Sequence, residues 1–206
     1  MSVPPDYIAL ALELKTLDPD YEKMMELASE RYEVLGRTCD ELGFAEDAMK
    51  TVDYEVSTET KQIRHENGDY ERVFVGYSCE QTIDLYFDFD ADRLTQVMTA
   101  ISRCAAKPLL SVGFTVKDPE AVREELLRSA TRNARQKAEI LADEAGVKLG
   151  QLISINYDWA DIQFYSPTSV SPRQGKYDQV LRMSARSIHP ENIKESDNAA
   201  FVWEIG

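Results

Sequence analysis

Three arginines, Arg128, Arg132 and Arg135, have the residue type and spacing that come closest to a binding site in this sequence. Guanidinium groups bind carboxylates and phosphates through paired hydrogen bonds, and at 100° per residue these three share one face of a helix. Glu124 precedes Arg128 by four residues, which is the spacing of a helical ion pair. Glu139 follows Arg135 at the same spacing. The sequence therefore favours a solvated or interfacial ion-pair face over an anion or partner site made of arginines.

Catalytic and metal-binding groups are sparse in the rest of the sequence. His65 and His189 both fall in predicted loops, without a nucleophile and an orienting acid at recognisable spacing. The segment FDFDAD holds Asp88, Asp90 and Asp92, but it lacks the glycine and the later glutamate of a calcium-binding loop. A strand end followed by a helix N-cap is the preferred interpretation of these carboxylates. We therefore predict no catalytic residue, no cofactor, no metal site and no enzymatic activity.

The three cysteines are predicted to be buried thiols. Cys39, Cys79 and Cys104 are odd in number, lack CxxC spacing and occupy apolar positions of their segments. Reduction of peroxide requires an accessible thiolate of low pKa, usually beside a resolving cysteine or a basic group. Any protection against oxidative stress is therefore expected to be indirect.

Composition excludes several classes of partner. The chain has 206 residues, 43% of them hydrophobic, and a net charge of −14. A protein that wraps nucleic acid needs a positive surface, so we expect no nucleic-acid partner. No apolar run is long enough to span a membrane, and the start MSVPPDYIALALELK lacks the features of a signal peptide. The sequence thus predicts a cytoplasmic protein without a membrane span.

Apolar periodicity predicts the elements that must position these residues. In chain order they are a strand near 6–16, a helix over 18–42, a long hairpin within 51–89, a helix over 90–105, a strand near 109–116, a helix over 118–145, and strands near 148–157 and 199–205. Each strand has one apolar face and each helix one apolar stripe. The predicted fold is α+β, with an antiparallel-rich sheet covered by three helices in the order β-α-β-β-α-β-α-β-β.

Capping residues mark the ends of the helices. Asp118 and Pro119 form an N-cap followed by proline at the first helical position, and Gly43 and Gly146 are placed as C-terminal stops. The hairpin turn is predicted at Asn67-Gly68. The last helix has a narrow apolar stripe rich in alanine, which favours a close approach to its support. The stripe comprises Leu127, Ala130, Ala134, Ala138, Leu141 and Ala145.

One segment, roughly 158–192, lacks regular periodicity and is treated as an irregular insertion in a single domain spanning 1–206. It concentrates large apolar side chains in too little regular pattern to bury them. These are Trp159, Ile162, Phe164 and Tyr165. Aromatic anchors are enriched at interface centres, so we expect the segment to contribute contacts in a closed homo-oligomer larger than a dimer.

The segment DPEAVREELLRSATRNARQKAEILADEAGVKLGQLISI, from Asp118 to Ile155, resembles the signature of the SIMPL-domain family of YggE-like proteins. Asp-Pro, spaced alanines, an Ala-Arg-x-Lys-Ala core written here as ARQKA, and AGVKLG before a strand carry the resemblance. Gly76-Tyr77 and Val112-Gly113-Phe114 also fit that family, as does the order of elements along essentially the whole chain. Leu126, which stands where the family tends to have alanine, indicates local repacking.

The resemblance implies little chemistry and leaves two classes of function open. Members of the family are described as oxidative-stress-defence, outer-membrane or periplasmic proteins. Some are immunogens, some form large hollow homo-oligomers, and a mammalian namesake associates with a signalling kinase. The first class is a non-enzymatic protein that assembles with itself into a cage- or ring-like particle, with an indirect role in stress defence. The second is a ligand-binding or enzymatic protein with a pocket between helices and sheet, or a monomeric adaptor for a protein partner.

Overall fold

A computed structural model describes residues 1–45, 47–65, 69–157, 162–171 and 187–206. The chain divides into two compact units. The first unit comprises 1–6, 115–167 and 190–206, and the second comprises 7–114 and 168–189. The described residues contain three helices and one five-stranded sheet whose strand pairings are mostly antiparallel, which confirms the predicted α+β class and order of elements.

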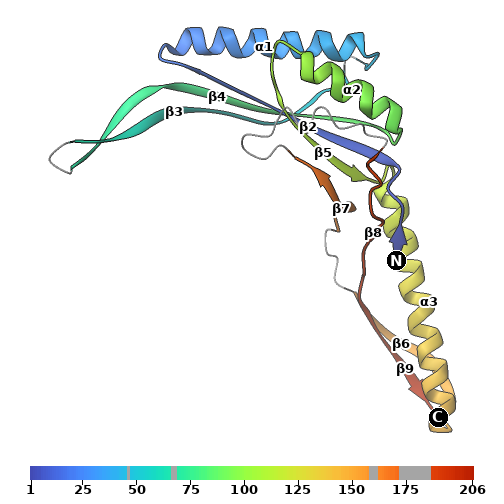
Figure 1. Ribbon diagram of the computed structural model, residues 1–206. Helices are drawn as coiled ribbons and strands as arrows, with labels where there is room; N and C mark the ends of the chain where they lie inside the picture. Colours follow the sequence, from blue (N-terminus) through green and yellow to red (C-terminus); the bar gives the residue numbers. More distant parts are fainter. Residues whose placement is uncertain (46, 66–68, 158–161, 172–186) are drawn as a thin grey trace. The chain divides into compact units, whose positions relative to one another are not determined.

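Most of a five-stranded sheet lies in the second unit, and its residues 115 and 165–167 belong to the first (Figure 1). Its order is β3-β4-β2-β5-β7. The strands are β2 (Tyr7–Asp18), β3 (Lys50–Arg64), β4 (Tyr70–Asp88), β5 (Leu109–Thr115) and β7 (Tyr165–Val170). Helices α1 (Tyr21–Glu41) and α2 (Ala91–Arg103) contribute to one core with alternate residues of β2, such as Leu10 and Leu12. The alternation read from the sequence therefore identifies the buried face of this sheet.

Strand β4 is longer than β2, the strand that pairs with it in the sheet. Ile83 and Leu85 are fully buried, but Val73 and Val75, which share their parity, are 36% and 39% exposed. The partner strand β2 ends at Asp18, opposite Tyr77. Residues of β4 before this point pair with β3, so the hairpin extends beyond the sheet (Figure 1). The register shift between Glu59 and Thr60 places a bulge at Val75, so the alternation of β4 does not continue to Val73, and it predicted neither the bulge nor the loss of cover.

Gly76 stands where β4 passes the end of β2. A Cβ atom at this position would lie 2.6 Å from the carbonyl oxygen of Asp18, closer than side-chain carbons approach backbone oxygen. Any other residue would force the two strands apart at the last pair of their ladder. Glycine is therefore required at position 76 by the close approach of two backbones.

The predicted hairpin turn at Asn67-Gly68 lies outside the described residues.

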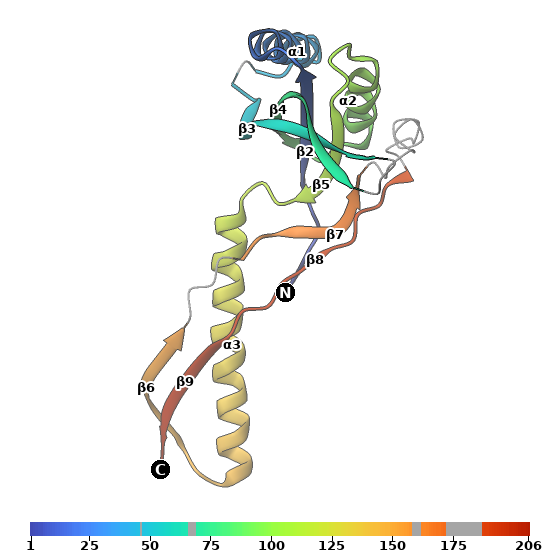
Figure 2. The ribbon, with the colours of Figure 1, turned by 90° about the vertical axis from the view of Figure 1, so that its left-hand side faces the viewer.

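The first unit has a smaller core and a separate pair of strands (Figure 2). Helix α3 (Pro119–Ala145) has its main strand contacts with β6 (Leu149–Tyr157) and β9 (Ala199–Ile205), which form a two-stranded antiparallel sheet. Strands β1 (Ser2–Val3) and β8 (Ile193–Lys194) form another. The third helix was expected on the same sheet as the other two. The predicted stripe is only partly covered, since Leu141 is 70% exposed and the buried residues of α3 are Leu126 and Ala142. The stripe also could not show which strands lie beside the helix.

Helix ends follow the capping residues. The carboxylate of Asp118 accepts a hydrogen bond from the amide of Ala121 at 2.9 Å, and Gly146 is left-handed at φ 69°. Asp90 caps α2, with its carboxylate 2.8 Å from the amides of Asp92 and Arg93, which confirms the interpretation of the FDFDAD segment. The start and end signals of the helices were thus correctly predicted.

Strand β7 lies within the segment that was predicted to be irregular. Pro167 interrupts the pattern and cannot donate a backbone hydrogen bond. Within a sheet, proline is confined largely to edge strands, and β7 is at the edge of the five-stranded sheet. Pro167 is the reason that the sequence did not predict β7, and it is compatible with the position of β7 at the edge.

Arg31 joins α1 to two other parts of the second unit. Its guanidinium donates to the carbonyl of Ala106, at 2.8 Å from the nearer nitrogen, and to the hydroxyl of Thr16 at 2.9 Å. It also donates to the carbonyl of Lys15. These oxygens belong to the turn after α2 and to β2, so a single side chain satisfies acceptors on both.

We predict that Arg31→Ala lowers the free energy of unfolding by about 2 kcal/mol, because charged hydrogen bonds to partly buried acceptors are lost. The matched control is Arg37→Ala on the exposed side of the same helix, with an expected change within about 0.5 kcal/mol. Urea unfolding followed by circular dichroism measures both. Equal effects of the two substitutions would contradict this role of Arg31.

Candidate functional site

Titratable residues do not converge on a catalytic or metal centre in the described part of the chain. Among those residues, no group of three or more His, Cys, Asp or Glu side chains is arranged to hold a metal ion. His65 instead pairs with Glu71 at 2.8 Å, with both side chains exposed on the β3–β4 hairpin. The clusters that remain are a lysine network, the cysteines and the helix–hairpin layer of the first unit.

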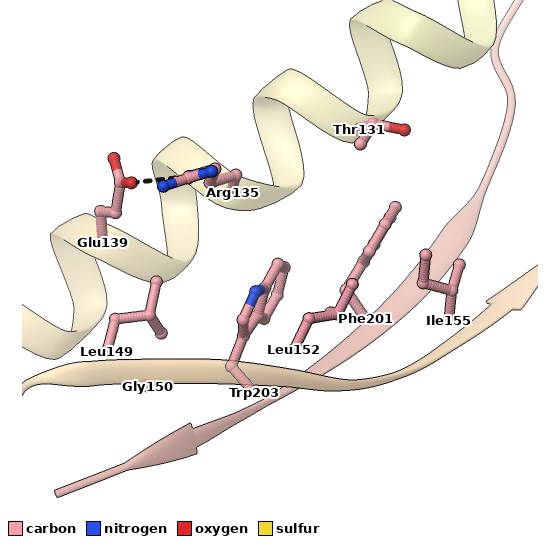
Figure 3. A pocket seen from close by; sticks show the side chains of 9 residues that line it. All are labelled: Thr131, Arg135, Glu139, Leu149, Gly150, Leu152, Ile155, Phe201 and Trp203. Carbon is pink, nitrogen blue, oxygen red and sulfur yellow. Dashed lines mark hydrogen bonds and ion pairs between the residues drawn. The ribbon is translucent and has the colours of Figure 1, made fainter.

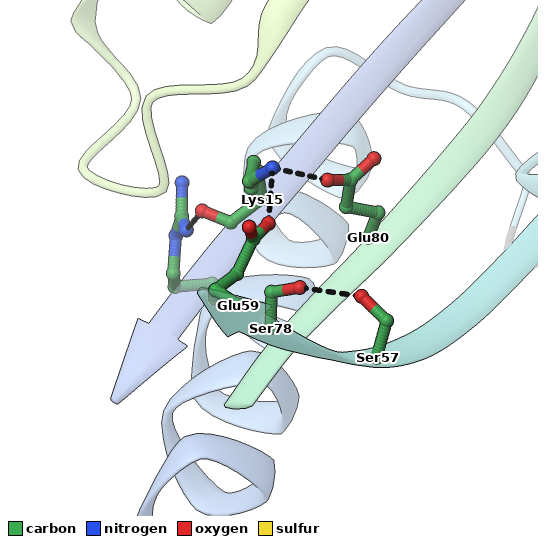
Figure 4. A network of polar contacts seen from close by, with 6 residues as sticks. Lys15, Ser57, Glu59, Ser78 and Glu80 are labelled. Atoms are coloured by element: carbon green, nitrogen blue, oxygen red, sulfur yellow. Dashed lines mark hydrogen bonds and ion pairs between the residues drawn. The ribbon is translucent and has the colours of Figure 1, made fainter. Parts of the chain in front are cut away.

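Lys15 bridges the central strands of the second unit (Figure 4). Its ammonium group lies 3.1 Å from a carboxylate oxygen of Glu59 on β3 and also pairs with Glu80 on β4. Hydrogen bonds to Glu80 and then to Glu59 raise the pKa of Lys15, and Lys15 lowers the pKa of Glu59. The pairing stabilises the charged forms of Lys15 and Glu59. A general acid or base instead needs to exchange a proton near neutral pH. The network is suited to joining three strands.

The cysteines lie where the sequence predicted. Cys39, Cys79 and Cys104 are all buried, with exposed fractions of 1%, 0% and 6%. Burial is the main cause that raises the pKa of Cys39 to about 11, followed by the neighbouring Cys104 and by Asp40. The sulfur of Cys104 accepts a hydrogen bond from the hydroxyl of Thr38 at 3.3 Å. Burial thus disfavours the thiolate of Cys39 at neutral pH and shields all three sulfur atoms from solvent.

Each of the three arginines of α3 is exposed and paired with a glutamate. Arg128 pairs with Glu124, and Arg135 lies 3.0 Å from Glu139, as their spacing predicts. Arg132 lies 2.6 Å from Glu125, a partner seven residues away that the spacing rule did not indicate. Each guanidinium therefore has a carboxylate neighbour, which weakens the case for a free anion site.

The apolar residues of the 158–192 segment have different surroundings. Trp159 lies outside the described residues. Phe164 is 3% exposed and belongs to the small core with Leu126, which is itself 4% exposed. Ile162 packs against that core, whereas Tyr165 is 46% exposed. The structure thus leaves Tyr165 available for a contact and uses Phe164 inside its own unit.

A groove separates α3 from the β6–β9 sheet in the first unit (Figure 3). It has a volume of about 460 Å³. Phe201 and Trp203 project into it from β9, with their rings stacked at 5.5 Å between centroids. Arg135 and Glu139 lie on the helix side of the groove. A second hollow, of about 250 Å³, lies along the alanine face of α3 and also borders Trp203. The helix therefore covers the sheet incompletely.

The opposite face of the same sheet is also apolar. Ile153 of β6 and Val202 of β9 are 62% and 49% exposed. On the face toward α3, Leu152 and Ile155 are still 46% and 56% exposed. The sequence pattern predicted one apolar face for each strand, and this second apolar face was not predicted. The available signal was the run of adjacent apolar residues in LIS and FVW, which departs from strict alternation.

The edges of this sheet lack the usual protection. Among the described residues, β6 and β9 pair only with each other. Neither strand contains Lys, Arg or Pro, and Glu204 is the single charged residue in both. By contrast, the edge strand β3 carries charged residues along its length, and the other edge strand, β7, contains Pro167. Since natural edge strands are commonly blocked by charge or proline, the β6–β9 edges are open to pairing.

Residues 1–200 match the model of the SIMPL family, described as a protein of unknown function (DUF541). The chain belongs to the SIMPL family. A search of curated proteins found no match to this SIMPL protein. None of its described helices is both long and apolar enough to cross a membrane.

We predict that the thiols of the folded SIMPL protein react slowly with a disulfide reagent at pH 8, because all three are buried and out of reach of the reagent. In urea, all three should react rapidly. The absorbance of the released thiolate measures both rates. Rapid labelling of one thiol in the folded protein, together with turnover of peroxide, would contradict the expectation of indirect protection.

Proposed function

We propose that this SIMPL protein is a non-enzymatic subunit of a closed homo-oligomer larger than a dimer. The helix–hairpin layer, defined as α3, β6 and β9, supplies the main contact between copies. The observation that carries the proposal is a two-stranded sheet with unblocked edges and exposed apolar side chains on both faces, such as Ile153 and Val202. A hollow, ring-like or cage-like particle is the assembly that we favour.

Backbone hydrogen bonding supports β9 as the strand that pairs between copies. An isolated two-stranded sheet is only marginally stable in water, and a third strand both satisfies free backbone groups and covers apolar surface. Strand β6 has irregular register around Leu152 and Ser154. Strand β9 is a seven-residue run, AAFVWEI, with one charge. It therefore offers the more favourable template for β-strand addition.

Charge supports assembly that stops at a defined size. The ion pairs of Arg128, Arg132 and Arg135 make the outer face of α3 compatible with an interface, because no unpaired guanidinium needs to be buried. The net charge of −14 opposes unlimited aggregation. Repeated identical contacts usually close into a symmetric particle. Ile162, Tyr165 and Trp159 are proposed as secondary contacts, whereas Phe164 is buried in the small core of its own unit.

The surroundings of the thiols support only an indirect role in stress defence. A buried thiol such as Cys39, with a pKa of about 11, is unsuited to reduce peroxide. Protection would then depend on what the assembled particle binds or encloses. A second candidate function, binding of a small molecule, is supported by a separate pocket in the second unit.

We predict that the purified protein has a mass several times 23.4 kDa by light scattering on a sizing column. Val202→Lys places a charge on the open β9 strand and should lower this mass, while the circular dichroism spectrum stays unchanged. The matched control is Val52→Lys, because Val52 is 57% exposed on the already charged edge strand β3. The control should leave the mass unchanged.

Two other outcomes distinguish self-assembly itself from the role of β9 in it. A monomeric wild-type protein at high concentration would contradict self-assembly itself. A large wild-type particle that Val202→Lys does not alter would contradict the role of β9 and leave assembly to other surfaces.

A further inference from the structure

A hollow of about 290 Å³ lies between α1 and the sheet of the second unit. Its lining residues are Met25, Ser29, Tyr32, Thr51, Tyr54 and Gln81. None of these side chains is charged, and they combine two aromatic rings with hydroxyl and amide groups. We call this hollow the α1–β3 pocket. Small-molecule sites commonly have this composition, with apolar walls and a few placed polar groups.

An irregularity in β3 shapes one wall of the pocket. Thr51 and Tyr54 are three residues apart, so in a regular strand they would point to opposite faces. The register shift between Thr51 and Asp53 inserts one extra residue, after which Tyr54 lies opposite Gln81. Thr51 lies opposite Ile83, which is on the same face as Gln81. The bulge therefore turns Thr51 and Tyr54 toward the same side, and such bulges are frequent beside functional sites.

Gln81 provides the polar group at the base of the pocket. It is 7% exposed and occupies the position of β4 where its neighbours on the buried face, Ile83 and Leu85, are aliphatic. Its amide nitrogen is 3.7 Å from the sulfur of Cys79, which is a weak acceptor. Its side chain also forms a hydrogen bond with Tyr54, and an amide with two N–H donors and an oxygen with two lone pairs keeps capacity for a ligand. A buried amide is stabilised by any ligand that completes its hydrogen bonds.

The aromatic wall adds a surface for a planar ring. Met25 and Tyr32, with Ser29 between them, lie on one face of α1 at spacings of four and three residues. The hydroxyl of Tyr54 lies 3.7 Å from the sulfur of Met25, and Tyr54 is 49% exposed. A hydrogen bond with Cys79 is the first cause that raises the pKa of Tyr54, so this hydroxyl remains a donor at neutral pH.

We propose that the α1–β3 pocket binds one small, uncharged, planar ring that carries a hydrogen-bond donor and an acceptor side by side. The amide of Gln81 pairs with both groups, as amides do with heteroaromatic edges. Tyr32, Tyr54 and Met25 contact the ring. Anions are disfavoured, because the lining lacks a cation and α1 carries exposed Glu26, Glu30 and Glu33 around it. The pocket lies in a different unit from the helix–hairpin layer, so this proposal does not depend on self-assembly.

Nicotinamide and nicotinate are the probes, because they have nearly the same shape but differ in charge and in the amide donor. Saturation-transfer difference NMR should show saturable binding of nicotinamide with a Kd of about 1 mM or tighter, as expected for a ligand of this size. Nicotinate should bind at least about tenfold more weakly. Absence of nicotinamide binding at about ten times that concentration would overturn the proposal.

Two variants test whether binding occurs at this pocket. Gln81→Leu removes the amide while filling a buried position suited to an aliphatic side chain, and should weaken nicotinamide binding at least about tenfold. The matched control, Gln62→Leu, lies on β3 outside the pocket and should leave the affinity unchanged. Equal affinity of all three proteins would overturn the assignment of the site. Preference for tetramethylammonium over nicotinamide would overturn the ligand class, in favour of an aromatic cage for cations.

Discussion

The antiparallel pairing of β2 with β4 is the constraint on which the second unit depends. All twelve residues of β2 have a partner in β4, from Tyr7 opposite Asp88 to Asp18 opposite Tyr77. A slip of one residue would move Leu10, Leu12 and Leu14 from the core to the other face. Gly76 permits the last pair to form, because a side chain there would collide with the backbone of Asp18. The core, the bridge made by Lys15 and the position of Gln81 all follow from this register.

Much of the fold could be predicted from the sequence because its signals are local. Alternation located the strands, and Asp118 and Gly146 marked the ends of α3. What could not be predicted depends on contacts between distant segments. The sequence of α3 does not state which strands lie beside it, and the alternation of β4 shows neither the bulge at Val75 nor where β2 ends. Strand β7 was missed because Pro167 is unfavourable in most strands but not at an edge.

The candidate sites divide in the same way. The pairs formed by Arg128 and Arg135 and the burial of the cysteines follow from spacing and parity, and both were predicted. The α1–β3 pocket depends on a bulge beside Thr51, which no pattern in the sequence marks. The exposed β6–β9 sheet was missed because an apolar residue in a strand was assumed to be covered by its own chain. Apolar side chains such as Ile153 fit the pattern of a strand although no described part of the same chain buries them.

The two units differ in how far each is stable by itself, and this difference has a consequence for the proposed assembly. The second unit covers one face of a five-stranded sheet with two helices, and its edge strands β3 and β7 are blocked by charge and proline. The helix–hairpin layer has two strands, open edges and little buried apolar surface on α3 beyond Leu126 and Ala142. Since pairing between copies stabilises only the folded layer, its stability increases with protein concentration, whereas that of the second unit does not. Association therefore adds stability to a layer that already folds within one chain.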